Sequence, residues 1–271
     1  MTDNLQDWLV RFHQDISRAM AVDELELPTL PEIATALQRL SAKQEPSISE
    51  LAAIVSQDSV LTAEFLRLTN SPLLGARTKI GTPLQSISRL GLDYSLNYAL
   101  AVSMEQLFVA SSQVLDNLVR NTWRQNQQIA RMSQQIAKQT GACSPAQAYL
   151  AGSLHQIGVL PMVSYLDQYP ELRNNGIYAK KIIDGMQSLV GGHLLAQWRF
   201  SPAMQAVPKA CTQLYRQESQ PLADTVMLAK ILSLPDNKRQ EIWPSLPLVE
   251  LWQLPEPNQG WLAELITQAK Q

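Results

Sequence analysis

The stretch Pro145–Met162, PAQAYLAGSLHQIGVLPM, places the polar pair His155 and Gln156 in an almost wholly apolar setting. We expect a helix that begins after Ser144, which can cap it, and that breaks at Gly158. Because small and apolar residues leave this helix no polar face, it should lie inside a domain. A buried histidine needs hydrogen-bond partners, so His155 is a metal ligand, an acid–base group, or a core residue tied to its neighbours.

Other residues that could do chemistry show weaker patterns. His193 lies on an apolar segment without a carboxylate at ligand spacing, which favours a core or surface histidine. The pair Gly191-Gly192 resembles part of a phosphate loop, but it is embedded in a helix that needs small residues for packing. Cys143 and Cys211 are isolated and fit no CxxC pattern, which is typical of reduced thiols. No Ser or Cys stands in a nucleophile context.

The 271-residue chain has the composition of a soluble globular protein, with 45% hydrophobic and 17% charged residues. Lys and Arg total 22 against 24 Asp and Glu. This near balance gives no electrostatic footprint for nucleic acid or for an anionic membrane. The N-terminus lacks the apolar core of a signal peptide, and no stretch approaches 18 uninterrupted apolar residues, so we expect a cytoplasmic protein without a membrane span.

The elements that must position His155 all repeat at helical spacing, and none alternates as a strand, which predicts an all-α fold. We expect residues 1–110 to form an N-terminal bundle of five or six helices, packed on a larger helical domain over residues 111–271. The predicted long helix from Gln113 to Thr140 has apolar residues on more than one face. Both halves should therefore bury against it and behave as one cooperative unit. The tail of the second domain is punctuated by prolines, which separate short pieces containing Trp243, Trp252 and Trp261.

Several motifs occur in a specific order. The N-terminal half contains LPTLPEI, ISELAAIVSQDSVLTAEFLRLTNSPLLG and SISRLGLDYSLNYAL, and the C-terminal half contains NTWRQNQQIARMSQQIA, AYLAGSLHQIGVL, VGGHLLAQWRFSP and TVMLAKIL. Over roughly residues 25 to 235 these motifs resemble the HDOD family, whose second half resembles the HD phosphohydrolases. The resemblance implies an HD-like helical domain and an output or signalling role in bacteria, usually without demonstrated hydrolase activity.

In a true HD site, a His from one helix, an adjacent His-Asp pair and a later Asp hold one or two divalent ions, which activate water against a phosphate ester. The resemblance places these four positions at Gln125, His155, Gln156 and Lys230, and a further histidine position at Gln187. We call these five residues the vestigial pocket. Three of the four ligand positions have lost their ligand chemistry, so we expect no catalytic residue, no metal and no cofactor. Asp224 lies six residues before Lys230, off the same helical face, and cannot simply replace the missing carboxylate.

Three hypotheses for the function follow. The first is a non-catalytic signalling module that acts through contacts with another signalling protein. The second is a sensor that binds a nucleotide or another small anion, because Lys230, His155 and the Gln side chains would form a cationic, hydrogen-bonding cavity. The third is a metal-dependent phosphohydrolase, which requires carboxylates from residues outside the matched positions.

Overall fold

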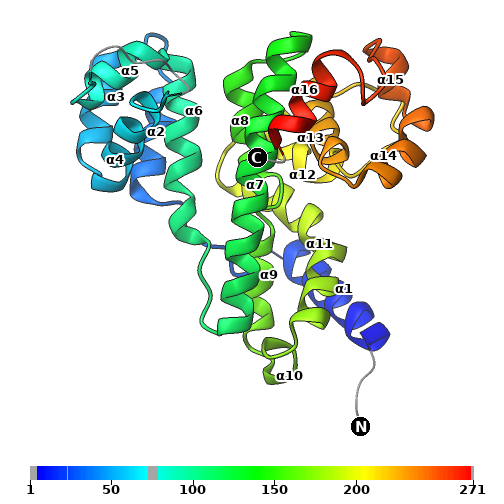
Figure 1. Cartoon of the computed structure of the whole chain (residues 1–271). Helices are drawn as coiled ribbons and strands as arrows, with labels where there is room; N and C mark the ends of the chain where they lie inside the picture. The colour runs from blue at the N-terminus through cyan, green and yellow to red at the C-terminus, as the bar shows by residue number, and fades with distance from the viewer. Residues whose placement is uncertain (1–4, 23, 73–78, 270–271) are drawn as a thin grey trace. The chain divides into compact units, whose positions relative to one another are not determined.

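The computed structural model describes residues 5–22, 24–72 and 79–269, and within these ranges it contains helices and no strand (Figure 1). The prediction of an all-α fold is therefore confirmed. The chain divides into two compact units. We call Thr29–Gln106 the small unit, and Met1–Pro28 together with Leu107–Gln271 the large unit.

The described part of the small unit folds into short helices joined by short connections. They are α2 (Glu32–Ser41), α3 (Ile48–Ser56), α4 (Ser59–Thr69), α5 (Pro83–Leu90) and α6 (Leu92–Ser103). Local sequence sets where these helices begin. Ser47 and Glu50 form a reciprocal capping box at α3, and the Asp58 carboxylate accepts from the first N–H groups of α4. The apolar stripes meet in a core of their own around Leu37, Leu51 and Phe65, each fully buried.

The large unit is built around the 28-residue helix α7. Its helices are α1 (Leu5–Ala21), α7 (Gln113–Thr140), α8 (Pro145–Leu154), α9 (Val159–Leu166), α10 (Pro170–Arg173), α11 (Gly176–Gln197), α12 (Pro202–Ala210), α13 (Pro221–Leu232), α14 (Asp236–Ile242), α15 (Pro247–Leu251) and α16 (Gly260–Ala269), with the 3-10 turn η3 (Trp243–Ser245). The 3-10 turn η2 (Glu105–Leu107) lies where the chain passes from the small unit to the large unit. Ser112 caps the start of α7, and Gly141 ends it with a φ of 66°.

Helix α8 lies side by side with α7 (Figure 1). The two backbones approach closely because α8 presents Gly152 to α7, and a Cβ at this position would lie 2.5 Å from the Ala130 Cα. The apolar stretch around His155 is buried, as predicted. It forms two helices, α8 and α9, with a turn over residues 155–158 between them rather than one helix that breaks at Gly158.

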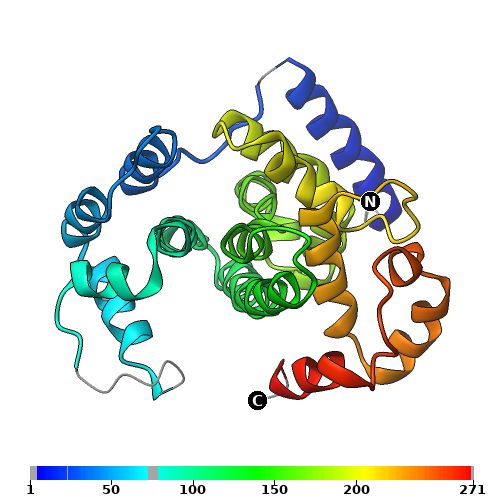
Figure 2. The ribbon, with the colours of Figure 1, turned by 90° about the horizontal axis from the view of Figure 1, so that it is seen from above.

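The first helix corrects the predicted domain boundary, because α1 belongs to the large unit and not to the N-terminal bundle. It lies along α11 (Figure 2) and is held by an aromatic cluster. The Phe12 ring is fully buried, with its centroid 5.3 Å from that of Tyr165 and 5.1 Å from that of Tyr169. Its apolar stripe shows that this helix must dock somewhere, whereas the docking partner is more than 150 residues away in sequence.

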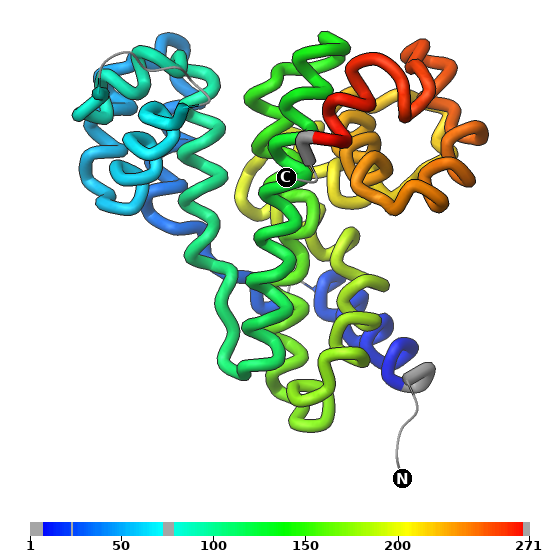
Figure 3. The backbone as a smooth tube through the Cα atoms, in the orientation of Figure 1, coloured from blue at the N-terminus to red at the C-terminus, as the bar shows by residue number. Residues whose placement is uncertain are grey.

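The proline-punctuated tail also belongs to the large unit. After α13 the chain runs through α14, η3 and α15, and α16 then returns to contact α7 (Figure 3). The Trp243 ring anchors this path in the core, where it is 2% exposed. The tail therefore brings its other two tryptophans, Trp252 and Trp261, to the C-terminal end of α7.

Candidate functional site

His155 follows the last turn of α8 and is 4% exposed. Its Nδ1 lies 2.7 Å from the carbonyl oxygen of Gly152. Since a carbonyl can only accept, Nδ1 donates, and the neutral ring keeps its lone pair on Nε2. Burial lowers the pKa of His155 from 6.5 to about 3, with a further lowering from the Lys230 charge and an opposing effect of the hydrogen bond to Gly152. The imidazole is therefore neutral near pH 7.

The turn after His155 is fixed against α11 through Gly158. A Cβ on Gly158 would lie 2.0 Å from the Gln187 carbonyl oxygen and 2.5 Å from the Gly191 nitrogen, so only glycine fits. Gly191 in turn faces the Gly158 nitrogen and the Pro208 ring, at 3.1 Å and 3.3 Å from its own ideal Cβ position. This packing confirms that Gly191 is a small residue required for contact between elements rather than part of a phosphate loop.

Lys230 reaches the same region from the last turn of α13. Its half-buried ammonium lies 3.5 Å from the Cys211 carbonyl oxygen and 3.8 Å from the Cys211 Sγ. Among the described residues no carboxylate forms an ion pair with Lys230. Burial raises the pKa of the Cys211 thiol, and the Lys230 charge opposes part of that rise. Lys230 is also near enough to His155 for its charge to lower the pKa of the imidazole.

The three glutamines of the vestigial pocket behave differently from one another. Gln187 is half-buried, and its Oε1 is buried without a hydrogen-bond partner among the described residues. Gln156 is half-buried as well, whereas Gln125 is exposed on α7. In the described part of the chain, neither Gln125 nor Gln156 makes a side-chain hydrogen bond to His155 or Lys230. Gln125 was predicted to belong to the vestigial pocket, but its side chain is exposed.

The neighbouring residue Asn126 is the polar group of α7 that sequence reasoning missed. It is fully buried, and its Nδ2 donates to the Ser153 carbonyl oxygen of α8 at 3.1 Å. Its Oδ1 is buried and has no partner in the described ranges. Helical spacing gives a signal for this, because Val119 and Ser133, seven residues to either side, are both buried on the same stripe.

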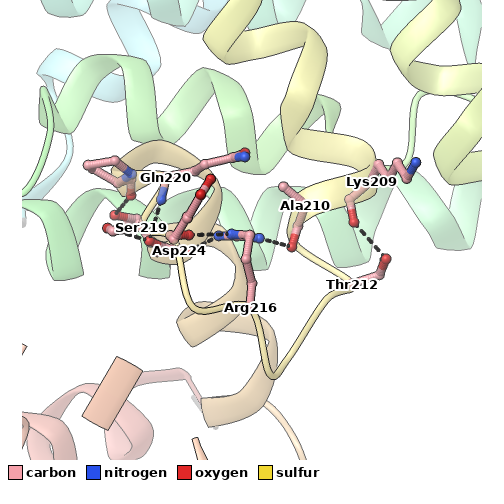
Figure 4. Close-up of polar contacts among 10 residues, drawn as sticks. Lys209, Ala210, Thr212, Arg216, Ser219, Gln220 and Asp224 are labelled. Carbon is pink, nitrogen blue, oxygen red and sulfur yellow. Dashed lines mark hydrogen bonds and ion pairs between the residues drawn. The ribbon is translucent and has the colours of Figure 1, made fainter. Parts of the chain in front are cut away.

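Asp224 has a structural role of its own (Figure 4). Its buried carboxylate pairs with Arg216 and accepts from the Ser219 hydroxyl and from the Gln220 N–H, each at 2.8 Å. Arg216 also donates through Nη1 to the Ala210 carbonyl oxygen at 2.7 Å. This clamp ties the segment between α12 and α13 to α13, and the carboxylate is occupied by it. As predicted, Asp224 does not replace the carboxylate that is missing at Lys230.

The residues around His155 do not fit a divalent ion. Within the described residues, no three or more His, Cys, Asp and Glu side chains gather where they could hold a metal. The charged group that acts on His155 is the Lys230 ammonium, a cation where a metal ligand would have to supply negative charge or a lone pair.

The family model of the HDOD domain matches residues 27–213. The chain belongs to the HDOD domain family. Among curated proteins, an uncharacterised protein of Treponema pallidum is 26% identical over 148 residues, which are 54% of this chain. The chain spans 28% of the length of that relative.

Several solved structures share the fold of this protein over nearly its whole chain. A candidate metal-dependent phosphohydrolase of Shewanella amazonensis is 22% identical with a TM-score of 0.75, and the match covers 95% of this chain and 99% of that one. An HDOD domain protein of Geobacter sulfurreducens is 18% identical with a TM-score of 0.60, over 99% of both chains. A candidate signal transduction protein of Marinobacter aquaeolei is 18% identical with a TM-score of 0.63, covering 97% of this chain and 64% of that one. These likenesses show the HD-like helical fold. Over the part of the chain that is described, no helix is long and apolar enough to cross a membrane.

Proposed function

We propose that this HDOD protein is a signalling module that acts through contacts with another protein and performs no hydrolysis at its HD-like site. The observation that carries this proposal is the Lys230 ammonium, which is close enough to His155 to lower the pKa of the imidazole. The same ammonium would repel a divalent ion bound at His155, because like charges repel strongly where little water screens them. The name of the Marinobacter aquaeolei protein supports the signalling class, whereas that of the Shewanella amazonensis protein supports the hydrolase alternative.

The test is metal analysis combined with phosphodiesterase assays. After incubation with manganese, iron and zinc, the parent protein is expected to retain less than stoichiometric metal and to hydrolyse neither a generic phosphodiester nor a cyclic dinucleotide. Stoichiometric metal that is lost on changing His155 to Ala, or turnover abolished by the same change, would overturn the non-catalytic proposal. Pull-down with the full chain from its native cell would then identify the signalling partner.

Restoring the ligand set provides a positive control. The changes Gln156→Asp and Lys230→Asp would be combined with either Gln125→His or Asn126→His, because the family motif points to the first position and burial points to the second. The combination that gains metal affinity identifies which residue of α7 faces the site. If both combined variants fold and neither binds metal, the assignment of the HD positions is wrong.

A second candidate function is a sensor of a small anion at the same site. The specific observation in its favour is Lys230, whose half-buried ammonium pairs with no carboxylate in the described residues. A ligand that binds only the folded state raises the melting temperature. A thermal-shift screen with inorganic phosphate and nucleotides, with Lys230→Met as the matched control, tests this function. A shift in the parent that persists in Lys230→Met would contradict it.

A further inference from the structure

A cleft of about 430 Å³ lies between the C-terminal end of α7 and the tail. Its lining includes Gln139 and Thr140 from α7 and Trp252, Gln253, Pro255 and Trp261 from the tail. The tail residues lie beyond the part of the chain that matches the HDOD family, which ends at residue 213. The volume falls in the range of sites for small molecules, about 300–1,000 Å³. This cleft is separate from the residues around His155.

The chemistry of the lining points to an uncharged ligand with many acceptors. No charged side chain lines the cleft. Trp252 and Trp261 are both partly exposed, so part of each indole is open to contact. In the described part of the chain, neither indole N–H makes a hydrogen bond, and the side-chain amides of Gln139 and Gln253 make none either. The cleft therefore combines two aromatic side chains with unused N–H donors on the two indoles and the two glutamines, whose amide oxygens are also free to accept.

The backbone conformation of Gln253 is a second, independent observation at this cleft. Gln253 takes a φ of 50°, the left-handed region that favours glycine. It occupies the turn that ends α15, where its N–H donates to the Glu250 carbonyl oxygen and the Leu254 N–H donates to that of Val249. This is the Schellman pattern, in which glycine is the usual residue at the position of Gln253. This chain has glutamine at that position in spite of the unfavourable backbone conformation, and the glutamine lines the cleft.

We infer that this cleft binds a proline-rich peptide segment in the polyproline II conformation, contributed by a partner protein. A polyproline II segment makes no internal hydrogen bonds, and its prolines lack N–H groups, so it presents carbonyl acceptors without competing donors. Such segments bind grooves lined by aromatic side chains. The indole and amide donors of the cleft match those carbonyls, and the Trp252 and Trp261 rings match the apolar proline rings. The inference rests on the proposed function in that the protein acts through protein contacts.

The probe is an oligoproline of ten residues, added to the full chain labelled with ¹⁵N at its tryptophan indoles. The chain has 6 tryptophans, and the four outside the cleft are each no more than 8% exposed. The peptide is expected to shift the indole signals of Trp252 and Trp261 selectively and saturably. A ten-residue Gly-Ser peptide, which lacks the preformed conformation, should cause at least tenfold weaker binding. Equal response to both peptides, or no shift of either indole signal at millimolar peptide, would overturn the inference.

Substitutions in the cleft test whether oligoproline binds there. Trp252→Ala and Trp261→Ala should each weaken binding at least tenfold, and Trp252→Phe, which keeps a ring but removes the N–H, should weaken it less. Tyr215→Ala is the matched control, because it removes a ring that is 59% exposed and does not line the cleft. If the alanine variants unfold, Gln253→Gly serves instead, since it should raise the melting temperature slightly while weakening binding. Unchanged binding in folded variants would contradict the inference.

A neutral oligosaccharide is the alternative occupant, because sugars also stack on tryptophan. Maltohexaose or cellohexaose that shifts the same two indole signals more strongly than oligoproline would overturn the peptide assignment. The outcome is separable from the proposed function. If the cleft variants lose oligoproline binding and still capture the same cellular partner as the parent, the cleft is not where that partner binds, and the inference fails while signalling through protein contacts stands.

Discussion

At the scale of single residues, the site depends on glycines, because a side chain larger than hydrogen at these positions would keep neighbouring helices apart. Gly158 lies against the backbone of α11, and backbone atoms cannot move aside as a flexible side chain could. Gly185 lies on the same helix α11 but is exposed and has open space around its Cβ position. The same change, glycine to alanine, should therefore have opposite effects at the two positions.

We predict that Gly158→Ala lowers the free energy of unfolding by about 3 kcal/mol, because the added methyl overlaps the Gln187 carbonyl group. Gly185→Ala should raise it by about 0.5–1 kcal/mol, because alanine loses less conformational entropy in a helix interior. Urea denaturation of both variants measures the difference. A Gly158→Ala variant as stable as the parent would show that the turn after His155 does not pack as described.

His155 makes stability depend on pH in a known direction. Its pKa in the folded protein, about 3, lies below the ordinary value of 6.5 that the unfolded chain retains. Between these values the unfolded chain binds a proton that the folded protein does not, so stability is complete above about pH 6.5 and falls as the pH is lowered toward 3. At pH 5 the loss from this one group should be about 2 kcal/mol, at 1.36 kcal/mol per pKa unit.

The variant His155→Gln isolates this contribution from that of the carboxylates, which titrate equally in both proteins. Unfolding free energies measured at pH 7 and pH 5 should differ by about 2 kcal/mol less in His155→Gln than in the parent. Equal pH dependence in the two proteins would show that the imidazole is not buried in its neutral form. Lys230→Met should raise the pKa of His155, although burial, the larger cause, keeps it below 6.5.

At the scale of elements, α7 supports the site because its buried stripe holds α8 and α13. Trp123 on this stripe is 7% exposed, and its ring centroid lies 4.8 Å from that of Phe108. We predict that Trp123→Ala lowers the free energy of unfolding by about 3–5 kcal/mol, from lost transfer energy and the cavity left behind. The exposed neighbour Arg124, changed to alanine, should alter it by less than about 0.5 kcal/mol. A loss below about 1 kcal/mol for Trp123→Ala would refute this packing.

The segment between α12 and α13 is held in place by side-chain contacts with α13. The Arg216–Asp224 pair and the Ser219 and Gln220 contacts fix a stretch that has no regular structure of its own. The same stretch begins at Cys211, whose carbonyl oxygen accepts from Lys230. The stretch that the clamp fixes therefore also supplies the carbonyl oxygen that accepts from Lys230.

At the scale of the whole molecule, the sequence predicts that the two halves unfold together, and this stays a prediction. Phe65 is fully buried in the small unit, so Phe65→Ala should lower stability by about 3–5 kcal/mol. If unfolding is cooperative across the chain, hydrogen-exchange protection will fall by similar amounts in residues 29–106 and in α7 and α8. Protection lost in the small unit alone would show that the units unfold separately.

The sequence by itself determined the helices, their caps, the HDOD family and the buried setting of His155. These features depend on periodicity and on contacts within a few residues, as at Ser47 with Glu50 or Ser112 with α7. The tertiary structure decided which side chain of α7 is buried, Asn126 rather than Gln125, because a shift of one residue turns a helix by about 100° and the family motif alone does not fix the rotation. It also decided that α1 joins the large unit and that Trp252 and Trp261 meet α7, since these contacts join segments more than 100 residues apart and leave no local pattern.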